Sequence, residues 1–238
     1  MKRMTSKLKI LTILVLLLFP IQAHSSCVVL LHGLARSDSS MKTLAKELEG
    51  EKFQIVNVGY PSREQRIEEL AETIIPAAIQ QCEPDRSINF VTHSMGGILV
   101  RQYLSNHSIP NLAHVVMLGP PNKGSEVVDK LKGVPGFHFI NGDAGLQLGT
   151  SEMSVPNRLG PAEFDVGIIA GTDSINLILS LLIPGIDDGK VSVERTKLEG
   201  MNDHITMETS HPFMMKNKKV IAQVIHYLKN GEFEHHGQ

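Results

Sequence analysis

The stretch from Ser87 to Gly97 constrains the fold of this chain more than any other. Its first part is rich in β-forming residues and stops at Ser94, and an amphipathic segment with helical spacing begins immediately afterwards. A strand that turns this tightly into a helix holds the turn residue in a strained conformation, with its side chain pointing upward. The neighbouring residues must be small so that strand and helix do not collide, and Gly96 and Gly97 meet this requirement. The stretch therefore predicts a strand–turn–helix unit that exposes the hydroxyl group of Ser94.

The same turn has the features of a nucleophile site, with one departure from the usual G-x-S-x-G pattern. Thr92 stands at the first position, and because threonine is larger than glycine we expect a more open turn or a displaced helix. A pattern as short as H-S-M-G-G also arises in ordinary glycine-rich turns. The strand and helix patterns on either side favour Ser94 as a nucleophile. The backbone N–H of Met95 would then lie at a helix N-terminus, where it can stabilise a developing oxyanion.

Short apolar runs alternate with amphipathic segments along most of the chain. The runs typical of buried strands cover residues 27–31, 53–58, 87–93, 115–118, 166–171 and 190–193. The segments with helical spacing cover residues 39–50, 67–79, 98–104 and 218–228. This alternation is typical of a mostly parallel α/β sheet with helices on both faces.

The pattern loosens between Asn122 and Glu163, where glycine, proline and serine recur and only Ser125 to Leu131 has helical spacing. We expect this segment to form a small, loop-rich cap over the carboxyl ends of the strands. Parallel α/β folds bind their ligands at that edge of the sheet.

The N-terminal residues have the pattern of a secretory signal peptide. Basic residues precede a largely apolar run over residues 10–21, and the polar and small residues Gln22, Ala23, His24, Ser25 and Ser26 follow it. We therefore expect a signal peptide over residues 1–23, one domain over residues 24–238, and export to the periplasm or the medium. The apolar run is short for a membrane span, so an uncleaved N-terminal anchor is the alternative.

Length, net charge and composition limit the classes of partner that we expect for this chain. A chain of 238 residues fits one domain, and a net charge of -2 gives no electrostatic reason to expect nucleic acid. Tryptophan is absent, which disfavours a surface for stacking bases or sugars. We expect a monomer.

The two cysteines, Cys27 and Cys82, each stand just before or at the start of a predicted strand. If those strands are neighbours in a parallel sheet, their starting ends lie side by side. An exported protein can then form a disulfide between the two residues. The alternative is a pair of unlinked thiols.

A serine hydroxyl is a weak nucleophile near neutral pH, so Ser94 needs an imidazole, and that imidazole needs a carboxylate to fix its tautomer. In this architecture the chain order is nucleophile, acid, histidine. The carboxylates beyond the turn that suit this order are Asp173, Asp187 and Asp188. The histidines that suit it are His204 and His211.

Four motifs together resemble those of α/β-hydrolase-fold esterases and lipases. They are L-L-H-G-L at residues 30–34, T-H-S-M-G-G at 92–97, P-P-N-K-G-S at 120–125 and D-D-G-K-V at 187–191. The set is particularly similar to bacterial triacylglycerol lipases and to the GPI inositol-deacylase-like group. The resemblance runs from Val28 to the last helix and implies an α/β-hydrolase fold. Thr92 and the lack of a long cap domain are its departures.

The resemblance also implies roles for individual residues. Asp188 would be the acid of the triad, and the N–H of Leu34 would join that of Met95 as an oxyanion donor, with His32 shaping their loop. Asp173 and Asp187 would be loop residues. For the base we choose His211, which precedes the last helix on a loop with Pro212, and His204 is the reserve. Some lipases of this kind hold Ca²⁺, but Asp203 alone gives no ligand spacing, so we expect no metal and no cofactor.

These features predict a serine hydrolase that cleaves carboxylic esters through an acyl-enzyme, acting on a small-molecule or lipid ester with transient contact to a lipid surface. One alternative is an acyltransferase that uses the same triad, and another is a non-catalytic binding or chaperone-like protein on this scaffold. Two apolar stretches, Leu177–Ile183 and Met153–Leu159, either line an acyl pocket or belong to the ordinary core.

Overall fold

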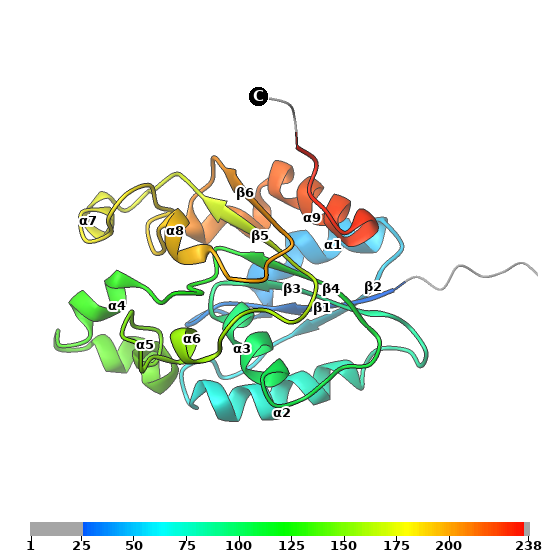
Figure 1. Cartoon of the computed structure of the whole chain (residues 1–238), viewed down its shortest axis with the longest axis horizontal. Helices are drawn as coiled ribbons and strands as arrows, with labels where there is room; N and C mark the ends of the chain where they lie inside the picture. Colours follow the sequence, from blue (N-terminus) through cyan, green and yellow to red (C-terminus); the bar gives the residue numbers. More distant parts are fainter. Residues whose placement is uncertain (1–25, 236–238) are drawn as a thin grey trace, which may run out of the picture.

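The computed structural model describes residues 26–235, which fold around one parallel sheet (Figure 1). Within those residues the strand order is β2-β1-β3-β4-β5-β6, and every neighbouring pair is parallel. The strands are β1 (Cys27–Leu31), β2 (Gln54–Val58), β3 (Ile88–His93), β4 (Leu112–Leu118), β5 (Val166–Gly171) and β6 (Asp203–Met207). The predicted parallel α/β architecture is confirmed.

Helices cover both faces of the sheet. Figure 1 shows α2 and α3 on one face and α1 and α9 on the other, while α4, α5 and α7 lie beyond one edge. The helices are α1 (Lys42–Gly50), α2 (Ile67–Ile79), α3 (Met95–Leu104), α4 (Glu126–Leu131), α5 (Phe137–Leu146), α6 (Val155–Arg158), α7 (Leu177–Ser180), α8 (Val193–Thr196) and α9 (Lys218–Asn230). Two short 3-10 turns are η1 (Asp38–Met41) and η2 (His211–Lys216).

The strand side chains alternate between two apolar layers. In β1, Val29 and Leu31 join the layer that α2 and α3 cover, while Val28 and Leu30 join the layer beneath α1 and α9. All four side chains are fully buried, and burial of a side chain of this size contributes about 1.5–3 kcal/mol. Burial on both faces explains why the strand is a continuous apolar run in the sequence.

The prediction of a last strand over residues 190–193 is wrong. Residues 190–192 form a bend that leads into α8, which begins at Val193, and a single antiparallel bridge joins Asp187 to Ser192. The last strand is β6, which pairs with β5 at the edge of the sheet. Its side chains are only partly buried or exposed, so its sequence D-H-I-T-M carries no continuous apolar run.

The cap between Asn122 and Glu163 holds more helix than predicted. Besides α4 it contains α5 and the single turn α6. The sequence pattern does not predict α5, because Gly142 interrupts the helix with a φ of 63°. A Cβ atom at this position would lie 1.8 Å from the carbonyl oxygen of Arg63, so only glycine lets the helix approach that backbone.

Two polar side chains fasten the cap to the domain. Arg101 of α3 is buried and donates to the carbonyl oxygens of Asn122, Pro156 and Gly160, at 2.9–3.1 Å. Burial lowers the pKa of this guanidinium to about 10. Gln147 accepts from the first N–H of α2 at 2.8 Å. The cap is therefore anchored on the face of the sheet that α2 and α3 cover.

Within residues 26–235, no helix combines the length and the apolar character needed to cross a membrane. The predicted signal peptide and the alternative anchor fall on residues outside this part of the chain.

A disulfide joins Cys27 at the start of β1 to Cys82, which lies between α2 and β3. The register of β1 and β3 pairs Cys27 with Ile88, so the starting ends of the two strands are side by side, as the sequence analysis supposed. The two Cα atoms are 5.8 Å apart, within the range of ordinary disulfides. The bridge spans 55 residues, and it stabilises the fold chiefly by restricting the unfolded chain.

Replacing both cysteines by alanine is expected to lower the free energy of unfolding by about 2–4 kcal/mol, because the unfolded chain regains the freedom of that loop. Urea unfolding of the double variant and of the oxidised wild type measures the difference. Reduced wild-type protein should unfold like the double variant. Two free thiols in the denatured, unreduced wild-type protein would contradict the prediction.

Candidate active site

The turn between β3 and α3 has the strained geometry that the sequence predicted. Ser94 has φ 54° and ψ -121°, in a region that non-glycine residues rarely occupy. A Cβ atom on Gly96 would lie 2.6 Å from the carbonyl oxygen of Leu31, so glycine is required there for α3 to pack against β1. The strain therefore persists because the packing around the turn leaves the chain no alternative path.

Thr92 fits at the first position of the motif because Gly97 leaves space for it. The threonine is fully buried, and its Oγ1 lies 3.2 Å from the place that a Cβ atom on Gly97 would occupy. The side chain of Thr92, which the usual glycine would lack, thus occupies space that Gly97 leaves open.

A buried carboxylate and imidazole face the same region from later loops. His211 Nδ1 donates to Asp188 Oδ2 at 2.7 Å, and both side chains are almost wholly buried. The other carboxylate oxygen accepts from the backbone N–H groups of Lys190 and Val191, each at 2.9 Å. This bonding places the proton of the neutral ring on Nδ1 and leaves Nε2 free to accept a proton.

The other candidates lie elsewhere. His204 is on β6, where its Nε2 is 3.0 Å from Thr196 Oγ1, and burial lowers its pKa. Asp187 accepts from Ser180 Oγ and from the N–H of Gly189, each at 2.7 Å, which is the local loop bonding that the sequence predicted. The geometry thus brings His211, and not His204, to Asp188.

Ser94, Asp188 and His211 line one cavity of about 470 Å³ at the carboxyl edge of the sheet. Its apolar lining comes largely from the cap and from α7: Leu34, Val127, Val128, Phe137, Leu148, Ile175 and Leu179. Of the two apolar stretches in question, the one containing α7 contributes to the lining. Met153 of the other is exposed and does not line it.

The residues predicted to donate to the oxyanion are Leu34 and Met95. Met95 is the first residue of α3, so its N–H has no acceptor within the helix. Leu34 follows β1 and lines the cavity. His32 holds this loop from below: its Nδ1 donates to the Gly33 carbonyl at 2.9 Å, and its ring stacks on Tyr60 with centroids 4.0 Å apart. Burial lowers the pKa of His32, which keeps the ring neutral in this role.

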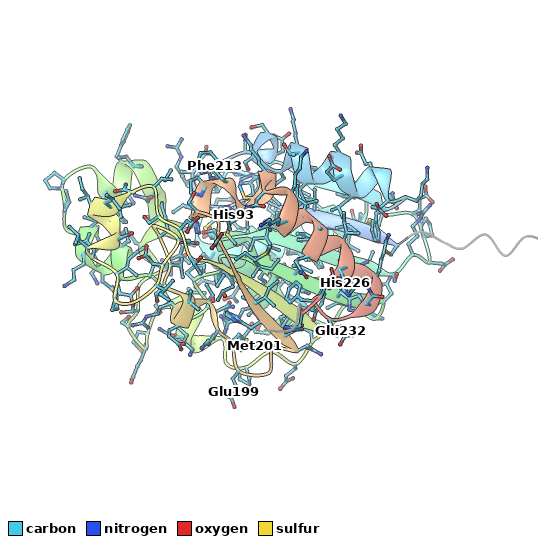
Figure 2. All side chains as sticks on the ribbon, turned by 90° about the horizontal axis from the view of Figure 1, so that it is seen from above. His93, Glu199, Met201, Phe213, His226 and Glu232 are labelled. Atoms are coloured by element: carbon cyan, nitrogen blue, oxygen red, sulfur yellow. A yellow bond between two sulfur atoms is a disulfide. The ribbon has the colours of Figure 1, made fainter. Side chains whose placement is uncertain are left out.

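His93 stands inside the H-S-M-G-G motif, and the sequence pattern predicts no role for it. Its Nε2 donates to the backbone carbonyl of His211 at 2.9 Å, and the two rings are 4.6 Å apart. Its Nδ1 is buried with no hydrogen-bond partner among the described residues. Figure 2 shows His93 near Phe213, which stands two residues after His211, in the middle part of the view. His93, which directly precedes Ser94, is thus hydrogen-bonded to the loop that carries His211.

The role of Gly119 is also not visible in the sequence, where the residue simply follows a predicted strand. It follows β4 with φ 55°, and a Cβ atom on it would lie 2.9 Å from Asp188 Oδ2 and 3.1 Å from His211 Nδ1. Gly171 does the same at the end of β5, where a Cβ would lie 2.8 Å from Asp188 Cβ. The acid and the imidazole therefore rest on two strand ends without side chains.

Gly119→Ala is expected to lower turnover at least tenfold, because the added methyl group displaces the carboxylate or the ring, and to cost about 1–2 kcal/mol of stability from the positive φ. Ester turnover and chemical unfolding measure the two effects. Gly136→Ala is the matched control: it also has positive φ (89°) but nothing lies within 4 Å of the new Cβ. Equal turnover in the two variants would contradict the prediction.

The stability of the protein should fall as the pH drops below 6.5. Burial, and then the nearby His211, lower the pKa of His93 well below that value, so the folded state binds fewer protons than the unfolded state. In this window, each unit by which the pH falls lowers the free energy of unfolding by up to about 1.4 kcal/mol through His93 alone. Urea unfolding between pH 7.5 and 5 measures the slope, and His93→Gln should flatten it. An unchanged slope would count against a buried neutral ring.

Solved structures share this fold. The mature lipase BlEst2 of Bacillus licheniformis is 19% identical with a TM-score of 0.65, and the match covers 87% of this chain and 92% of that one. Phospholipase PlaB from Legionella pneumophila is 18% identical with a TM-score of 0.60, over 73% of this chain and 45% of that one. YbtT, a type II thioesterase from the yersiniabactin NRPS/PKS pathway, is 13% identical with a TM-score of 0.59, over 90% and 96%. The predicted α/β-hydrolase fold is confirmed.

A search among curated proteins gives no match. The family model of palmitoyl protein thioesterase matches residues 27–159, which is more than half of the chain. The matched part includes the turn at Ser94 and the loop of Leu34, and it ends before Asp188 and His211. The chain belongs to the palmitoyl protein thioesterase family.

Proposed function

We propose that this protein is a serine hydrolase that cleaves acyl esters or thioesters through an acyl-enzyme on Ser94. The observation that carries the proposal is the buried hydrogen bond between Asp188 and His211, which lines the same cavity as the strained Ser94. A scaffold protein has no need to bury a carboxylate and an imidazole beside a strained serine, since both features cost stability.

In the first half of the reaction, Ser94 Oγ forms a bond to the acyl carbon while His211 Nε2 takes the proton of the serine hydroxyl. The N–H groups of Leu34 and Met95 stabilise the oxyanion, and Asp188 stabilises the imidazolium. The oxyanion then collapses, the bond to the leaving group breaks, and the leaving thiol or alcohol takes the proton from His211.

In the second half, water loses a proton to His211 and attacks the acyl carbon. The bond to Ser94 Oγ then breaks, the serine regains the proton, and a carboxylic acid is released. Acyl transfer would differ only in that an alcohol replaces water. Product analysis in the presence of a competing alcohol separates the two reactions.

Two observations support an apolar acyl chain as the substrate. The cavity wall is built of apolar side chains from α4, α5 and the segment around α7. Large apolar side chains on these elements and beside them are exposed: Phe139, Ile140, Ile175, Leu177, Ile178, Leu181 and Phe213. Figure 1 shows α5 and α7 at the same end of the molecule. An exposed apolar rim of this kind suits transient contact with a lipid surface.

We include thioesters as substrates because of the family to which the chain belongs. Export from the cytoplasm is also part of the proposal. The disulfide between Cys27 and Cys82 supports an oxidising compartment, since such bonds are rare in reducing ones.

Ser94→Ala is expected to lower turnover of p-nitrophenyl octanoate and of S-octanoyl-N-acetylcysteamine by about a thousandfold or more, because no other group can carry the acyl chain. A fluorophosphonate probe should label the wild type and not this variant. His211→Ala should abolish both activities, while His204→Ala, the matched control, should keep them. Undiminished turnover in Ser94→Ala would rule out the proposed nucleophile.

A further inference from the structure

Two cationic side chains line the same cavity as Ser94, and the proposed chemistry uses neither of them. Arg36 follows the loop of Leu34, and Lys190 follows Asp188 in its turn. No carboxylate within residues 26–235 forms an ion pair with either head group. The cavity lining therefore carries two positive charges that form no direct ion pair with a carboxylate of the described residues.

The carboxylates near these cations are engaged elsewhere. Asp188 accepts three hydrogen bonds, from His211 and from two backbone N–H groups. Asp187 accepts from Ser180 Oγ and a backbone N–H. Asp38 makes no ion pair with Arg36, and its charge acts on His32. A ligand could thus form the direct ion pair with Arg36 and Lys190 that these carboxylates do not form.

The two head groups lie close enough to act on each other and on the ring beside Ser94. Desolvation and then repulsion from Arg36 lower the pKa of Lys190, and the charge of Asp188 opposes this shift only in part. Both cations also lower the pKa of His93. Two like charges held together at a cavity mouth repel each other, and a bound anion would relieve that repulsion.

We propose that Arg36 and Lys190 bind a phosphate group on the leaving group of the acyl substrate. This inference rests on the proposed hydrolase function. A simple acyl chain is apolar and matches the wall of Val127, Val128 and Phe137, so an anionic group must belong to the other end of the substrate. Phosphate fits the pair because the guanidinium of arginine can bind two of its oxygens while lysine supplies a point charge.

Such a phosphate has two chemical sources. It can belong to a soluble phosphorylated thiol that carries the acyl group as a thioester, or to the headgroup of a lipid that carries it as an ester. Pairs of substrates that share the acyl chain and differ in the phosphate distinguish these sources.

The first experiment measures binding without turnover. Octyl phosphate and octyl glucoside, both below their micelle concentrations, are titrated into the Ser94→Ala protein by calorimetry. Octyl phosphate should bind at least tenfold more tightly, and Arg36→Gln or Lys190→Gln in the same background should each remove about tenfold of that preference. Lys46→Gln, an exposed lysine of α1 outside the cavity, is the matched control and should leave the preference unchanged. Equal affinity for the two probes would overturn the proposal.

The second experiment measures turnover. Octanoyl-coenzyme A is compared with S-octanoyl-N-acetylcysteamine, and 1-octanoylglycerol 3-phosphate with 1-octanoylglycerol. In at least one pair, the ratio of kcat/KM for the phosphorylated to the neutral member should fall about tenfold in Arg36→Gln and in Lys190→Gln, and not in Lys46→Gln. The thioester pair reports the soluble source and the glycerol pair reports the lipid headgroup. A ratio that neither variant changes in either pair would overturn the proposal.

The two experiments separate this inference from the function on which it rests. If no substrate is cleaved but octyl phosphate binds as described, the hydrolase proposal fails and the phosphate site stands. If the neutral substrates are cleaved and the ratios do not change, the hydrolase proposal stands and the phosphate site fails.

Discussion

The hydrogen bond between His211 and Asp188 is the interaction on which the rest of the site depends. It joins two loops that follow different parts of the sheet, and both partners are buried. A buried pair of this kind is costly unless every lone pair is matched, because desolvation takes both groups out of water. Here the turn after Asp188 supplies two N–H donors, and the backbone N–H of His211 donates to the Asp188 carbonyl at 2.9 Å. Both oxygens of the carboxylate thus accept hydrogen bonds from the protein itself, and a backbone bond ties the two loops together.

A parallel sheet makes this arrangement possible. All six strands run in the same direction, so their carboxyl ends meet at one edge, where loops from distant parts of the chain come together. The edge must also leave room for them. Gly119 and Gly171 end β4 and β5 without side chains, and Gly33 lies where a Cβ atom would be 2.8 Å from His93 Nδ1. Close packing of backbone against the reacting side chains is what requires glycine at these positions.

Strands that are buried on both faces could be predicted from the sequence. The outermost strand of the sheet and the helix that a glycine interrupts could not. β1 and β5 lie inside the sheet and consist only of apolar residues and glycine, and the turn at Ser94 carries its own signature of glycines. β6 lies at the edge and lacks such a run, and Gly142 conceals α5. His93 has a role only because the fold brings it to His211, a contact between residues 118 apart in the sequence, which no local pattern reveals.

The positions of Arg36 and Lys190 indicate how substrate binding and catalysis share the same loops. Each cation stands two residues after a group of the proposed mechanism, Leu34 in one loop and Asp188 in the other. The backbone N–H of Lys190 holds the carboxylate while its side chain lines the cavity, so one residue serves both purposes. Because a turn that fixes Asp188 also fixes the start of the Lys190 side chain, an anion bound there would be held at a defined distance from Ser94. Such an anion would help to position the acyl carbon for attack by Ser94.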